Sequence, residues 1–109
     1  MSADDDGINN RRLKYELEHA IKQINRDLIG EAAGTLGRED FSQVAKMVAC
    51  LRARYLQTTL KMAESSGDQC IDTESALELK NLRIAYEEAL AAFDALEHAL
   101  RRGYIDFAA

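Results

Sequence analysis

The chain has 109 residues with a net charge of −5; it contains no proline, and its residues are 47% apolar and 30% charged. This length fits one domain, and the balance of apolar and charged residues is that of a globular protein. The acidic balance disfavours nucleic-acid binding by the molecule as a whole. No apolar run approaches the ~18 residues of a membrane span, and the absence of proline favours uninterrupted helices.

The N-terminal sequence and the cysteines bear on the compartment. Residues 1–6 are acidic and polar, whereas a secretory signal needs a basic start followed by an apolar stretch. We therefore expect a cytoplasmic protein that does not enter membranes. Cys50 and Cys70 fit that compartment as free thiols.

The first expected helix follows an acidic tail. Residues 1–8 are predicted to be disordered, and the helix is expected to begin at Asn9 or Asn10, because asparagine is a favoured N-cap. Apolar residues then recur three and four apart, as one helical face requires. This stripe consists of Leu13, Leu17, Ala20, Ile21, Ile24 and Leu28.

Glycines interrupt the chain after this stripe, at Gly30, Gly34 and Gly37. They are expected to end the first helix and to form the first turn. The alternative is a frayed continuation of the helix through Ala32 and Ala33.

The second helix is expected to start at Glu39 or Asp40, because Asp40 and Gln43 have the spacing of a capping box. Its apolar stripe keeps a three-four alternation, with one polar lapse at Thr58. The stripe consists of Phe41, Val44, Val48, Leu51, Tyr55, Thr58 and Met62. Residues 65–68, Ser-Ser-Gly-Asp, are expected to end this helix.

The third helix is expected to start at Asp72 or Thr73, with Glu74 placed favourably for the helix dipole. It repeats the same heptad pattern through Leu79, Leu82, Tyr86, Ala89, Phe93, Leu96 and Leu100. Gly103 is expected to be a left-handed C-cap, with Tyr104 folding back onto the last turn. Residues 104–109 form a short tail.

The short linker decides how the second and third helices pair. Only about seven residues join them, so they are expected to lie antiparallel as a hairpin. Folding the chain about residue 70 brings Tyr55 near Tyr86 and Val48 near Phe93. The predicted fold is therefore an all-α, three-helix antiparallel bundle over residues 9–103, with a long coiled-coil-like hairpin.

The second helix carries another apolar face, roughly 130° round from the first at ~100° per residue. It consists of Ala45, Ala49, Ala53, Leu56, Leu60 and Ala63. Because a helix that is apolar most of the way round is usually buried on several sides, we expect the second helix to be central. Its small second face suits close approach by the first helix.

Leu77, Ile84 and Ala91 lie seven apart, opposite the heptad stripe of the third helix. Two interpretations stay open: scattered surface apolar residues, which are normal, or a surface for a partner. The predicted partner-binding residues are these three, together with Leu56 and Leu60 on the second helix.

Candidate chemistry is sparse. Glu16 and His19 have the Glu-x-x-His spacing of di-iron bundles, but such bundles need the motif twice, and Ala95 stands three residues before His98. Asp94 and His98 are four apart, a spacing that usually only supports a helix. The sequence therefore predicts no catalytic residue, no metal and no cofactor.

The first helix carries five basic residues, which four acidic residues partly offset. The basic residues are Arg11, Arg12, Lys14, Lys22 and Arg26. The sequence favours a non-enzymatic protein–protein interaction module: an adaptor, an assembly factor or a chaperone-like helical protein. Its partner is expected to be another protein or a second copy, as a homodimer. The alternatives are a nucleic-acid-associated regulator acting through the first helix and a metal-binding helical bundle.

Overall fold

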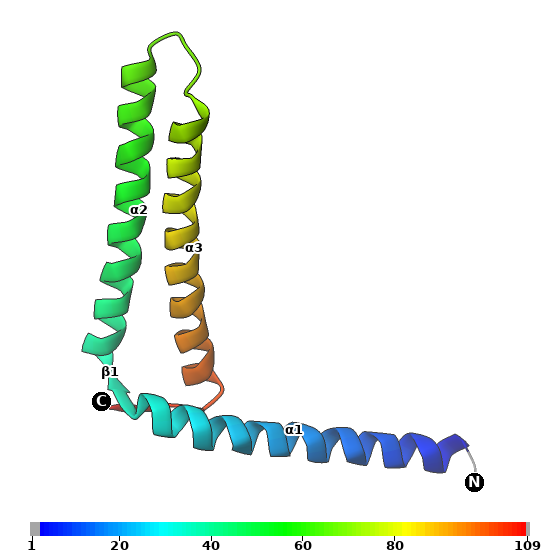
Figure 1. Cartoon of the computed structure of the whole chain (residues 1–109). Helices are drawn as coiled ribbons and strands as arrows, with labels where there is room; N and C mark the ends of the chain where they lie inside the picture. The colour runs from blue at the N-terminus through cyan, green and yellow to red at the C-terminus, as the bar shows by residue number, and fades with distance from the viewer. Residues whose placement is uncertain (1–2, 109) are drawn as a thin grey trace. The chain divides into compact units, whose positions relative to one another are not determined.

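A computed structural model describes the backbone of residues 3–108 and the side chains of residues 7–108. Figure 1 shows three helices, α1 (Ala3–Ala33), α2 (Arg38–Ser66) and α3 (Thr73–Arg101). Two short strands, β1 (Thr35–Gly37) and β2 (Asp106–Ala108), pair as a two-stranded sheet. The predicted all-α class with three helices is confirmed, and the strand pair is an addition that the sequence pattern did not reveal.

The chain divides into two compact units. The hairpin unit, Gly37–His98, holds α2 and nearly all of α3. The terminal unit joins Met1–Leu36 to Ala99–Ala109, and so combines α1 with the end of α3 and the segment that follows it.

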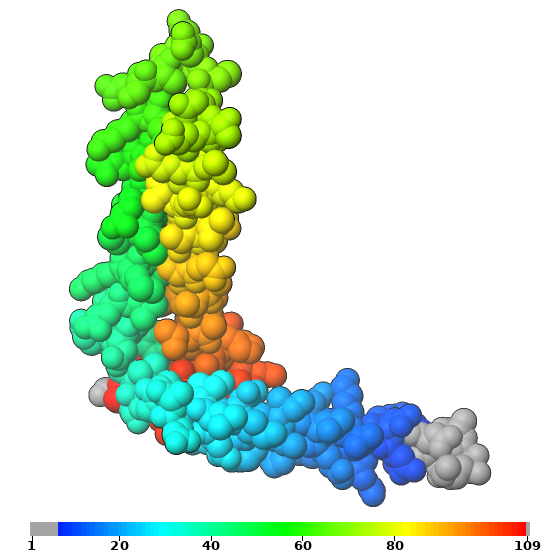
Figure 2. All heavy atoms as spheres, viewed as in Figure 1, coloured from blue at the N-terminus to red at the C-terminus, as the bar shows by residue number. Residues whose placement is uncertain are grey.

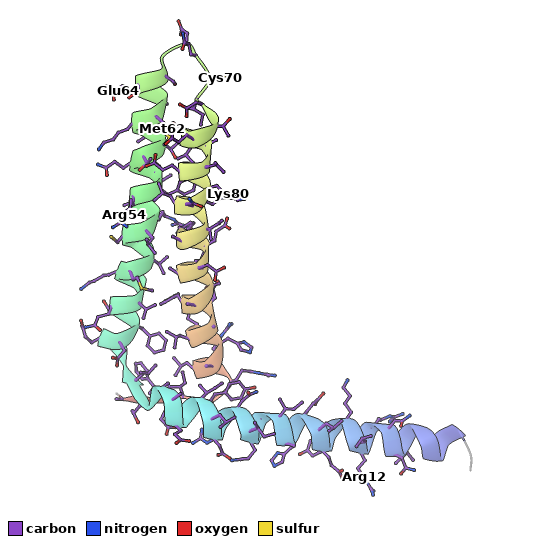
Figure 3. All side chains as sticks on the ribbon, in the orientation of Figure 1. Arg12, Arg54, Met62, Glu64, Cys70 and Lys80 are labelled. Atoms are coloured by element: carbon purple, nitrogen blue, oxygen red, sulfur yellow. The ribbon has the colours of Figure 1, made fainter. Side chains whose placement is uncertain are left out.

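The hairpin unit follows the predicted heptads. α2 and α3 run antiparallel and pack against each other along their length, as Figures 1 and 2 show. Each residue of both stripes, from Phe41 to Met62 and from Leu79 to Leu96, is half-buried or buried. In Figure 3, Met62 lies on the side of α2 that faces α3, whereas Arg54 points away from it. The seven-residue period therefore identified the shared face correctly.

The expectation that the second helix is buried on several sides is wrong. No residue of α2 is buried, and its second face, from Ala45 to Ala63, is exposed. In a hairpin of two helices, each helix is covered only along the stripe that faces the other helix. The buried residue of the hairpin unit is Ala89 on α3, which is 7% exposed.

α1 begins earlier than predicted. The helix starts at Ala3, so residues 3–8 are helical where the sequence predicted a disordered tail; Met1 and Ser2 lie outside the described residues. Favoured N-cap residues at positions 9 and 10 suggested the later start, but acidic residues are also stabilised near a helix N-terminus by the helix dipole. The acidic sequence of residues 4–6 is therefore compatible with the longer helix.

The first turn follows the alternative with the longer helix. α1 continues to Ala33, and the N–H of Gly34 donates to the carbonyl of Gly30 at 2.8 Å. Gly34 has a φ of +69°, a left-handed conformation that glycine adopts without the Cβ clash of other residues. Gly34 rather than Gly30 therefore ends the helix.

An aspartate accepts a backbone hydrogen bond at the N-terminus of both α2 and α3, but at a different helical position in each. At α2, which begins at Arg38, Asp40 Oδ2 accepts the N–H of Gly37 at 2.8 Å, so Asp40 occupies the third helical position and is not the N-cap. At α3, Asp72 Oδ1 accepts the N–H of Ser75 at 2.8 Å, as an N-cap does. The predicted start of α3 is confirmed, and that of α2 is one or two residues late.

The end of α3 has the predicted left-handed glycine cap. Gly103 has a φ of +77°, and its N–H donates to the carbonyl of Leu100 at 3.1 Å. The N–H of Tyr104 reaches back to the carbonyl of Ala99 at 2.9 Å. This pair of bonds is a Schellman motif. Tyr104 and Ala99, the two positions that usually make an apolar contact in this motif, are both buried.

Candidate interaction surfaces

The predicted partner-binding residues of α3 lie on its outer side. Leu77 is 53% exposed, Ile84 is 42% exposed, and Ala91 is also exposed. Because they are seven residues apart, they follow one line along the helix. The hairpin does not use this line for its own packing.

The second face of α2 carries Leu56 and Leu60, 53% and 70% exposed. It also holds a shallow hollow of about 350 Å³, lined by Ala45, Val48, Ala49, Arg52, Ala53 and Leu56. Alanines spaced four apart produce such a hollow, because their small side chains leave room between bulkier neighbours. We call this surface the α2 alanine face.

Arg52, at the edge of the α2 alanine face, contacts Tyr86 on α3. Arg52 Nε donates to the hydroxyl of Tyr86 at 3.0 Å, and its Nη2 donates to the same oxygen. The guanidinium carbon also lies 4.9 Å from the centroid of the Tyr86 ring, within the range of a cation–π interaction. Arg52 stands one turn before Tyr55, so this contact agrees, to within a helical turn, with the register predicted from the linker.

The apolar stripe of α1 is exposed. Leu13, Leu17, Ile21 and Ile24 are each 53–55% exposed, and Leu28 is 63% exposed. All residues from Ile8 to Ile24 are exposed, on every side of the helix. The periodicity identified a real amphipathic helix, but the chain's own packing does not bury its apolar face.

α1 packs instead through its last turns. Its half-buried residues there are Asn25, Ile29, Gly30 and Ala33. At ~100° per residue these positions are centred roughly 150° from the middle of the apolar stripe. A Cβ built on Gly30 would lie 3.5 Å from the carbonyl oxygen of Tyr104. This part of α1 therefore lies against the segment that follows α3.

That segment holds two of the four buried residues of the described chain, Tyr104 at 8% exposure and Ile105, the most buried of the four, at 3%. Arg26 fastens it to α1, donating to the carbonyl of Gly103 at 2.5 Å and to Asp106 Oδ1 at 3.4 Å. Residues 104–109 were predicted to form a short tail. The signal for their burial is the apolar pair Tyr104–Ile105, which directly follows the capping glycine.

A second hollow in the terminal unit is partly basic. It measures about 470 Å³ and is lined by Tyr15, Glu18, His19, Ile21, Lys22, Arg101, Arg102 and Tyr104. Basic residues far apart in sequence, Lys22 and the Arg101–Arg102 pair, meet here. The hollow joins cationic and aromatic groups, which are suited to an anionic ligand with an apolar part.

The residues that the sequence offered as metal ligands or acid–base groups lie on the surface. Glu16, His19, Asp94 and His98 are exposed, as are the free thiols of Cys50 and Cys70. Across the described residues, no three histidine, cysteine or acidic side chains gather as metal ligands. The hydrogen bonds from the backbone and then the side chain of Ser75 lower the pKa of the Asp72 carboxyl, as its N-cap position requires.

Comparison of the chain with protein-family models, curated protein sequences and solved structures finds no significant match. In the described part of the chain, no helix has both the length and the apolar character needed to cross a membrane.

Proposed function

We propose that this chain is a non-enzymatic protein–protein interaction module: an adaptor, an assembly factor or a chaperone-like helical protein. One observation carries the proposal. The hairpin packs with one stripe of each helix and leaves a second apolar surface on both α2 and α3. A second copy of the chain is included among the partners.

The shape of the α2 alanine face favours a helical partner. Its hollow lies between small side chains, so the backbone of a second helix can approach closely and insert a larger apolar side chain. Leu56 borders the hollow, and Leu60 lies one turn further along the same face. Burying apolar area of this kind stabilises a complex by ~25 cal/mol per Å², before the entropy cost of association.

Variants of the exposed faces test this proposal. Affinity capture from the native cell is expected to retain a specific protein on the wild-type chain and to lose it on Leu56→Glu or Ile84→Glu. Arg54→Glu is the matched control, because Arg54 is exposed on α2 outside the alanine face. If the apolar variants retain the same proteins as the wild type, these surfaces do not bind the partner.

Sedimentation equilibrium distinguishes a second copy of the chain from a different protein as the partner. A 12.2 kDa species at every concentration, unchanged by Ile84→Glu, would show that the outer face of α3 does not bind a second copy. A larger species that falls to 12.2 kDa with Ile84→Glu would place a homodimer contact on that face.

A second candidate function rests on the basic hollow. Lys22, Arg101 and Arg102 together favour an anionic partner, and nucleic acid is the polyanion to test. Affinity for DNA or RNA is then expected to fall steeply as salt rises and to weaken further with Arg101→Glu. Binding that is insensitive to salt, or no binding at low salt, contradicts a nucleic-acid role.

A further inference from the structure

The exposed stripe of α1 has a symmetric order. Its six members lie in pairs equidistant from the point between Ala20 and Ile21: Leu13 with Leu28, Leu17 with Ile24, and Ala20 with Ile21. The large residues match large ones, and the single small residue matches a large one. A stripe read from either end therefore presents almost the same surface.

This order has a geometric consequence for two copies of the helix. When two helices pair antiparallel about a two-fold axis, each residue lies level with the one equidistant from the axis on the other copy. An axis between Ala20 and Ile21 sets each apolar residue of the stripe against another. A parallel pair would instead set Ala20 against Ala20 and leave a gap at the centre.

Charge along α1 also favours the antiparallel arrangement. Residues 11–14 include three basic side chains, whereas residues 27–31 include two acidic ones. Antiparallel pairing brings the basic stretch of one copy level with the acidic stretch of the other. Parallel pairing places each stretch beside its own charge, which is unfavourable.

The exposed area is sufficient for a dimer. Five of the six side chains are large and more than half exposed. Each can remove on the order of 100 Å² from water, so two copies bury about 1,000 Å² in total, the lower limit for a specific interface. This area predicts a reversible dimer.

The helix itself needs such a contact. From Ile8 to Ile24 every residue is exposed, and a helix of this kind is only marginally stable without tertiary packing of its apolar face. A second copy provides that packing without another protein.

From these observations we infer that two copies of the chain pair through α1, antiparallel, about a two-fold axis between Ala20 and Ile21. This inference rests on the proposed interaction function and assigns its self-association to the α1 stripe rather than to the hairpin.

The first experiment measures mass against concentration. Sedimentation equilibrium at micromolar concentrations is expected to show a dimer for the wild type and a 12.2 kDa species for Leu17→Glu and Ile24→Glu. Ile8→Glu is the control, since Ile8 is 55% exposed and lies on the opposite side of α1; it should remain dimeric. Circular dichroism of each variant checks that the hairpin is still helical.

The second experiment determines the orientation. With Cys50 and Cys70 replaced by serine, Leu13→Cys and Leu28→Cys chains carrying tags of different mass are mixed and oxidised. Antiparallel pairing is expected to give the mixed disulfide in preference to either self-disulfide. Predominant Leu13→Cys self-disulfides would show a parallel pair and overturn the inference.

The outcomes distinguish this inference from the proposed function. A dimer that survives Leu17→Glu but is lost with Ile84→Glu overturns pairing through α1 and keeps the interaction function. A wild-type monomer at all concentrations also overturns the pairing, and the capture experiment with Leu56→Glu then decides the interaction function alone.

Discussion

The hairpin unit and the terminal unit use their apolar stripes in opposite ways. In the hairpin, two heptad stripes face each other, and each stripe residue loses part of its exposure. In the terminal unit, the stripe of α1 is exposed, while contacts on another side of the helix hold Tyr104 and Ile105 in place. Equally clear periodicity therefore leads to an internal contact in one unit and an open surface in the other.

The linkers differ in structure rather than in length. Six residues without a strand separate α2 from α3, and these helices pair as a hairpin. Only four residues, 34–37, separate α1 from α2, but three of them form β1, which pairs with β2. A stripe shows which face of a helix favours burial, and its spacing does not show whether the same chain buries it.

The largest expected effect is in the terminal unit. Replacing Ile105, 3% exposed, with alanine removes buried methyl groups at a typical cost of ~2–5 kcal/mol. Amide hydrogen exchange should accelerate in residues 25–33 of α1, while the hairpin amides stay protected. Tyr15→Ala, at a 72% exposed position, is the control and should change neither. Equal acceleration in both units would contradict their separation.

An intermediate effect is expected in the hairpin. Leu51 belongs to the stripe that faces α3 and is half-buried, so Leu51→Ala should cost about 1–2 kcal/mol rather than the ~2–5 of a fully buried site. Urea unfolding measures this change in free energy. Leu60→Ala, at a 70% exposed position, should stay within about 0.5 kcal/mol of the wild type. If the two variants cost the same, the hairpin stripe is not the stabilising face.

The smallest effect concerns the first turn of α3. Because Ser75 lowers the pKa of Asp72 in the folded chain, the carboxylate stabilises the turn above its ordinary pKa of ~3.9 and loses this contribution as pH falls through the lowered value. Exchange of the Ser75 amide should therefore show extra opening below about pH 4. Asp72→Asn keeps an N-cap oxygen but should abolish this pH dependence, and an unchanged dependence would assign it to another group.

Local signals predicted the hairpin well. The stripes from Phe41 and Leu79 and the glycine cap at Gly103 each depend on neighbouring residues, and each is confirmed. The three-residue strands were missed because they are too short to show a period of two. The burial of Ile105 was missed because it depends on contacts between segments far apart in sequence.

For the candidate surfaces, the sequence identified which residues are apolar but not which are covered. Leu77, Ile84 and Leu56 are exposed, as a partner surface requires, and their binding role stays a prediction. The stripe from Leu13 to Leu28 belongs to a predicted three-helix bundle, but its large residues are exposed. A stripe that faces a neighbour and one that faces solvent have the same spacing, so the sequence does not distinguish them.

The bond from Arg26 to Gly103 joins residues 77 apart, whereas that between Arg52 and Tyr86 spans 34. During synthesis, the hairpin contacts can form while residues beyond α3 are still being added. The packed end of α1 has no partner until the segment around Tyr104 has been made. Closing the long loop between these two segments costs conformational entropy, and this is the last such cost in folding. We therefore expect the hairpin to fold before α1 docks, and the nascent chain to expose two apolar sides of α1 during that interval.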